Sequence, residues 1–292
     1  MHTCKPIIWT IALPFTRRRP TTMNDLFRCA LAFSMILGVT AAQSSAADKA
    51  RTVLNDGAAD SNPHHRREVA LALGLLRQGD PSTDLLRKLV SDHDVQVRVA
   101  AIASIADLHG TNFIPELNRA LDDNVPEVAF AAAKSLWSLG QPIGKQVLLA
   151  VLEGDRKARS NYFRRKYRRM MRTFSSPRGA ILFALTQGVA FVPVPGAGEG
   201  LSALQALFFE SGFSPRASVA IRLAQDRGPE VQAALIDALS DGDWSVRAAA
   251  VQAIGMRNDP GLRDHLVPLM HDDSSHVRFR AAAAYLRLSS MQ

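Results

Sequence analysis

Cysteine is nearly absent from this 292-residue chain, and its two cysteines, Cys4 and Cys29, both precede residue 47. A mature chain that starts near residue 47 therefore has no thiol, disulfide or cysteine metal ligand. The chain also lacks sustained strand-type alternation of apolar and polar residues, a His-Glu dipeptide and a GxSxG nucleophile elbow. We expect a protein that is not an enzyme, with no cofactor and no small-molecule substrate.

Two further patterns fall short of a ligand site. The pair His64-His65 and the trio His265, His271 and His276 lack the i, i+4 facing of a helical metal pair, so we expect surface or inter-helix roles and no metal ligands. The glycine-rich segment 189–202 resembles a phosphate-binding loop but contains no lysine, and its prolines weaken the strand that such a loop would need. We expect this segment to form the turn of a helical hairpin.

What the chain does contain is a repeat. The stretch Asp241–Gly255 reads DGDWSVRAAAVQAIG, and related stretches begin at Asp92 and Asp272. An acidic residue precedes an arginine by six positions in each of the three, and a small, apolar, helix-favouring run follows. The whole set of acids and six-later positions is Asp60/Arg66, Asp92/Arg98, Asp123/Ala129, Glu210/Arg216, Asp241/Arg247 and Asp272/Arg278. The later positions are 32, 31, 87, 31 and 31 residues apart, and a fixed period near 31 is typical of a helical solenoid.

The coarse pattern predicts an all-α fold: an α-solenoid of HEAT-like helix pairs interrupted by a basic and apolar helical insert. Short helical stretches alternate with Gly, Pro or Asp stops from residue 63 onward. We expect a linker over 48–62, repeats over 63–152, the insert over 153–210 and further repeats over 211–292.

The acid and arginine of the motif are best explained structurally. We expect the acid to cap its helix and the arginine to pair with an acid or a carbonyl of an adjacent repeat. The structural repeat positions are Asp92, Arg98, Asp241, Arg247, Asp272 and Arg278. Ala129 replaces the arginine in the third copy, which breaks any continuous row of arginines.

These residues resemble the HEAT-like repeats of the phycobilisome-lyase type, in which the first helix of a pair opens with acid-x-x-x-x-Val-Arg and continues Ala-rich. The resemblance covers about 60–152 and 210–288. It implies the architecture, and it hardly specifies the function, because such repeats serve unrelated roles. The family includes bilin lyases and, through related repeats, iron-dependent hydroxylases with His-Glu ligand pairs. No residue here carries over either activity.

The N-terminal region predicts export. From Met23 a short polar start with Arg28 leads to an apolar run, Cys29–Ala42, and then to small residues ending Ser45-Ala46-Ala47. This is the layout of a secretory signal peptide over about 23–47, after an upstream extension, and the run is shorter than the roughly 20 residues of a spanning helix. An uncleaved anchor is the alternative. We expect an exported protein, periplasmic or envelope-associated.

The insert holds most of the excess positive charge. Residues 155–178 contain ten Lys or Arg and one acid, Asp155. Within it the apolar positions Phe163, Tyr167, Met170, Met171 and Phe174 share one helix face, and arginines largely occupy the other. The candidate contact residues for a membrane or a partner are Phe163, Arg164, Arg165, Tyr167, Arg168, Arg169, Met170 and Arg172.

Three interpretations of this insert stay open. It is an aberrant repeat with a solvated arginine face, or its basic helix lies on an anionic membrane surface, or the 156–172 helix binds nucleic acid. Export and the acidic remainder of the chain argue against nucleic acid. We therefore predict an exported, non-catalytic helical-repeat scaffold that mediates protein–protein interaction and associates with a membrane surface, with nucleic-acid binding as the alternative.

Overall fold

The computed structural model describes residues 46–157 and 214–291, and every regular element in these two ranges is a helix. The chain divides into two units between Ser45 and Ala46, and the second unit contains all of the described residues. The predicted all-α solenoid is confirmed for these ranges. Within them, no helix is both long enough and apolar enough to cross a membrane.

Each repeat consists of a long helix followed by a shorter α or 3-10 segment. A first helix covers residues 46–58. The long helices are α2 (Pro63–Leu73), α4 (Val95–Asp107), α6 (Pro126–Ser138), α7 (Pro142–Lys157), α12 (Pro215–Arg222), α14 (Trp244–Arg257) and α15 (Ser275–Ser289). The shorter segments are η1 (Pro81–Asp84), α3 (Leu85–Leu89), η2 (Thr111–Phe113), α5 (Ile114–Ala120), η4 (Leu223–Gln225), α13 (Pro229–Asp237), η5 (Ala238–Ser240), η6 (Pro260–Leu266) and η7 (Pro268–His271).

Local sequence fixes where these helices begin. The side chain of Asp94 accepts the backbone N–H groups of Gln96 and Val97 at the start of α4, and Asp243 accepts that of Ser245 at the start of α14. Proline occupies the first turn of α2, α6, α12 and α13, where its missing N–H costs no hydrogen bond. Alanine-rich runs then let the long helices pack closely side by side.

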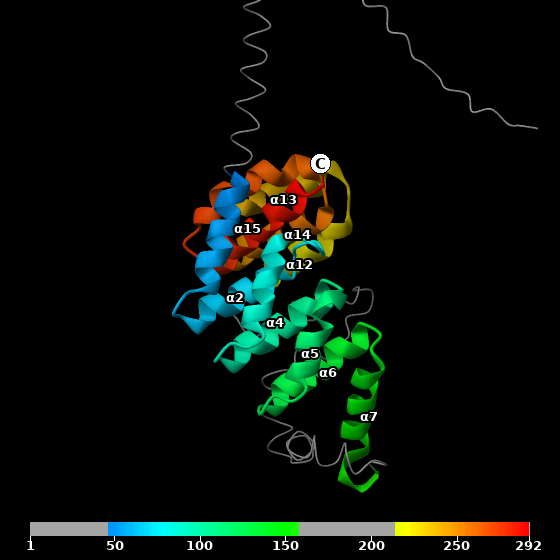
Figure 1. Cartoon of the computed structure of the whole chain (residues 1–292). Coiled ribbons are helices and arrows are strands. Elements are labelled where there is room, and N and C mark those ends of the chain that lie inside the picture. The colour runs from blue at the N-terminus through cyan, green and yellow to red at the C-terminus, as the bar shows by residue number, and fades with distance from the viewer. Residues whose placement is uncertain (1–45, 158–213, 292) are drawn as a thin grey trace, which may run out of the picture. The chain divides into compact units, whose positions relative to one another are not determined.

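The order of the repeats in space differs from their order in the chain. The helices α2, α4, α6 and α7 pack in succession, and α12, α14 and α15 do the same. The last long helix, α15, packs against α2, so that the red and blue ends of the chain meet in Figure 1. The C-terminal repeats therefore precede the N-terminal repeats in one continuous array, α12–α14–α15–α2–α4–α6–α7. We call the contact of α15 with α2 the joint.

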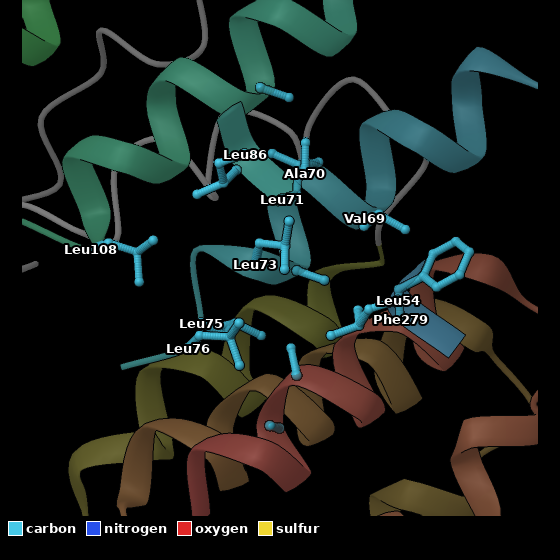
Figure 2. Close-up of a cluster of buried hydrophobic side chains, with 14 of the residues drawn as sticks. Leu54, Val69, Ala70, Leu71, Leu73, Leu75, Leu76, Leu86, Leu108 and Phe279 are labelled. Atoms are coloured by element: carbon cyan, nitrogen blue, oxygen red, sulfur yellow. The ribbon is translucent and has the colours of Figure 1, made fainter. Parts of the chain in front are cut away.

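The joint has a closely packed apolar core. Leu54, Val69 and Phe279 are all buried where the helix over 46–58, α2 and α15 meet (Figure 2). A Cβ atom on Gly57 would lie only 2.4 Å from Phe279 Cε1 and 2.6 Å from Val69 Cγ2, so this position requires glycine. The first helix thus packs beside the last repeat.

The expected linker over 48–62 is therefore wrong for most of its length. Residues 46–58 form a helix, and its Ala50 and Leu54 have no exposed surface. The segment is polar overall, but the residues spaced by three or four positions on its buried face are small or apolar. The predicted insert over 153–210 and the predicted signal segment over 23–47 lie almost wholly outside the described residues.

Candidate functional site

The motif arginines join neighbouring repeats. Arg247 donates to both carboxylate oxygens of Asp272 at 2.8 Å, and Arg66 donates to those of Asp92 at 2.8 and 2.7 Å. The same connection links Arg98 to Asp123 and Arg216 to Asp241. Each pair joins one repeat to the next, and we call this set the ladder. Burial by itself would raise the pKa of Asp272, but the bonds from Arg247 and from the Ser274 N–H lower it.

A second contact of each arginine explains the six-residue spacing. One guanidinium nitrogen of Arg66, Arg98, Arg247 and Arg278 donates to the backbone carbonyl of the acid six positions earlier, at 2.7–2.9 Å. The acid does not cap its own helix, which corrects our expectation. Its carboxylate instead accepts the N–H group two residues later in the loop, as Asp92 does from Asp94. The capping group is that later residue, for example Asp94.

A pocket of about 270 Å³ lies along this ladder. It is lined by Val90, Ser91, Asp92, Arg98, Glu116, Arg119, Ala120 and Asp123. Its charged side chains bond mainly to one another or to other motif residues: Arg98 pairs with Asp123, and Arg119 donates to Glu116 at 3.3 Å. These contacts make the pocket a polar gap between repeats rather than an array of groups directed at a ligand.

The joint uses a different set of charged groups. Glu68 on α2 is 2% exposed, and its Oε2 accepts from Arg280 Nη1 at 3.0 Å and contacts His276 Nδ1 at 2.7 Å. Burial alone would raise the pKa of Glu68, but the charge of Arg280 and the bond with His276 lower it to about 2. Glu68 therefore carries a negative charge across the physiological range, inside the contact between the last and first repeats.

His64, Glu68 and His276 form a three-residue group at the joint, which we call the joint triad. One potential ligand atom from each residue lies within 4.8 Å of the other two. His64 and Glu68 are one turn apart on α2, and the ring of His64 lies edge-on to that of His276, with centroids 5.1 Å apart. Trp244 of α14 stacks on His276 at 4.3 Å, which fixes the plane of that imidazole. Partial desolvation lowers the pKa of His64 and so favours its neutral form.

A second polar connection holds the other side of the joint. Arg287 on α15 donates to the carbonyl oxygen of Leu75, just after the end of α2, at 2.8 Å, and to the side chain of Asn258 at 2.8 Å. Desolvation lowers the pKa of the Arg287 guanidinium, and nearby Arg77 adds to this effect. The joint is thus fixed by charged side chains on both sides of its apolar core.

The end of the array at α7 exposes apolar side chains. Of the four large apolar residues that are exposed in the described ranges, Trp137 (56%), Leu149 (44%) and Leu152 (81%) lie on α6 and α7. Val147 and Ala150 face α6 and are buried. We call Trp137, Leu149 and Leu152 the α6–α7 surface.

The predicted contact residues between 163 and 172 lie outside the described residues. The predicted repeat positions from Asp92 to Arg278 all lie within them and belong to the ladder or its backbone contacts. Sequence reasoning missed the joint triad. The i, i+4 spacing of His64 and Glu68 was a usable local signal, but nothing local connects either residue to His276.

Comparison with known proteins identifies the repeats. A family model of HEAT repeats matches residues 83–161 and 203–287, which together exceed half of the chain. A search of curated proteins finds no matching relative. The matched ranges carry the ladder and the close packing of long helices described above. The chain therefore belongs to the HEAT-repeat family.

Proposed function

We propose that this protein is an exported, non-catalytic scaffold that binds a protein partner through the α6–α7 surface. The observation that carries the proposal is the concentration of exposed large apolar side chains at that end of the described array. Exposed tryptophan and leucine are costly to leave in water and are typical anchors of protein interfaces. HEAT-repeat arrays commonly act as protein-interaction scaffolds, which supports the same conclusion.

The geometry of α7 suits docking. Its Lys145, Leu149 and Leu152 are exposed at helical spacing, while its opposite face packs on α6. In a repeat array, the outer face of such a helix is normally covered by the next repeat. A partner that presents an apolar helix face to Leu149 and Leu152 would complete this packing, and Lys145 would favour an acidic rim on the partner.

The use of the charged motif residues supports a non-catalytic role. Arg66, Arg98 and Arg247 each bond to their own loop and to the next repeat, so their guanidinium groups serve the array. The carboxylates that they contact are likewise engaged in structural bonds. Groups held in this way are poorly placed to transfer protons to a substrate.

Export is proposed from the signal-like segment before residue 47. The division of the chain between Ser45 and Ala46 falls at the same place as the expected cleavage site, and cleavage there would leave the packed helix over 46–58 nearly whole. Intact-mass measurement of protein from the native envelope tests this proposal. We expect a chain that starts near Ala47 or Asp48, and a mass that retains residues 31–39 would contradict soluble export.

Site-specific photo-cross-linking tests the scaffold proposal. A photoreactive residue is placed at Leu152, which is 81% exposed, and at exposed Asp237 on α13 as the matched control. We expect a discrete cross-linked protein from position 152 in cells, lost when Leu149→Ser is added, and none from position 237. Equal labelling from both positions, or none from either, would contradict binding through the α6–α7 surface.

A further inference from the structure

We propose that His64, Glu68 and His276 bind a Zn²⁺ ion that fastens the last repeat to the first. The proposal goes beyond the scaffold function and does not depend on it. It starts from the placement of three potential ligand atoms, all within 4.8 Å of one another, on two helices that meet at the joint. A metal ion in this position would replace a contact between repeats by direct bonds to both of them.

The chemistry of the three groups suits zinc. Two imidazoles and one carboxylate are a common protein ligand set for Zn²⁺, whereas Mg²⁺ and Ca²⁺ prefer sites made of oxygen atoms alone. His64 and Glu68 lie one turn apart on α2, which directs both side chains to the same side of the helix. Three protein ligands leave a further coordination position for water.

The protonation of the triad is already close to what a metal requires. Glu68 is ionised, and partial desolvation favours the neutral form of His64, so both would offer a lone pair at neutral pH. Glu68 Oε2 and His276 Nδ1 are 2.7 Å apart and share a proton. Entry of the metal would release that proton and join the two groups through the ion.

The surroundings hold the ligands in place. Trp244 stacks on the imidazole of His276, and Arg280 donates to Glu68 at 3.0 Å, as a group that orients a ligating carboxylate would. Arg280 is itself 2% exposed, so its charge remains near the ion. That charge opposes a dication, and we therefore expect weaker binding than at a closed structural zinc site.

Metal titration of untagged, metal-stripped full-length protein tests the proposal. We expect about one Zn²⁺ per chain, a higher melting temperature on binding, and release of protons. His64→Ala should abolish binding and the thermal shift, because this exposed residue supplies a ligand without supporting the core. His65→Ala is the matched control: His65 is the adjacent histidine but contacts Asp60 at 2.7 Å instead, and it should retain both effects.

Cobalt supplies a signature of location. Co²⁺ at the triad should quench the fluorescence of Trp244, which lies against a ligand ring, and Trp244→Phe should keep the stoichiometry while losing that quenching. Circular dichroism of each variant confirms that it is folded. Absence of saturable Zn²⁺ binding, or equal binding by wild type and His64→Ala, would overturn the proposal.

Discussion

The bond between Arg247 and Asp272 offers the sharpest test of how neighbouring repeats are held together. Arg247→Ala removes two 2.8 Å bonds to the Asp272 carboxylate and two bonds to loop carbonyls of its own repeat. The side chains of Arg247 and Asp272 are only 18% and 11% exposed, so water compensates incompletely for their loss. A hydrogen bond to a charged group contributes about 1.5–3 kcal/mol, and residual solvation reduces the sum here to a loss of roughly 1–3 kcal/mol.

Arg216→Ala is the matched control for this prediction. Arg216 makes the equivalent bond to Asp241, but its side chain is 68% exposed, so solvent screens the pair. Urea unfolding of the two variants and the wild type, followed by circular dichroism, compares the free energies of unfolding. A double-mutant cycle of Arg247→Ala with Asp272→Ala isolates the pair. Equal stability of wild type and Arg247→Ala, or an equal loss in both arginine variants, would refute the reasoning.

Three other predictions use the same measurements or simple binding assays. Burial raises the pKa of Asp107 to about 8, partly offset by Lys134, so its favourable contribution to folding is complete below pH 4 and is lost as the pH rises toward 8. Asp107→Asn should therefore stabilise the protein at pH 8.5 by roughly 2 kcal/mol and have little effect at pH 4, as measured by urea unfolding; a gain that is independent of pH would contradict this. Gly57→Ala should cost about 1–3 kcal/mol by overpacking the joint, whereas Gly242→Ala, with open space at its Cβ position, should not; equal thermal melts of the two variants would count against the close packing. If the predicted basic helix attaches the protein to membranes, anionic vesicles should sediment it, and changing the four arginines within 164–169 to glutamine should leave it in the supernatant; equal recovery of both proteins there would end the membrane interpretation.

The ladder could be predicted from the sequence because both of its contacts follow fixed spacings. The arginine meets a carbonyl six residues before it and an acid 25 or 26 residues after it, so a period near 31 records the whole arrangement. The division of labour between Asp92, which holds the loop, and Asp94, which caps the helix, could not be predicted from spacing alone, because two acids lie within three positions.

The joint could not be predicted in the same way. His276 and Glu68 are 208 residues apart, and a repeat pattern does not state which of its ends stack on each other. The helix over 46–58 was missed for a related reason. Its polar residues suggest a linker, and the buried face of Ala50, Leu54 and Gly57 has meaning only once Phe279 is placed against it.

Stacking of the last repeat on the first is the central structural claim, and a pair of introduced cysteines tests it most directly. With Cys4 and Cys29 changed to serine, His64→Cys and His276→Cys place two thiols where ring centroids are 5.1 Å apart. A control pair combines His64→Cys with Leu152→Cys on α7, which is separated from α2 by α4 and α6. We expect mild oxidation to form an intramolecular disulfide in high yield in the first pair and not in the control. No more cross-linking in the first pair than in the control would contradict the joint.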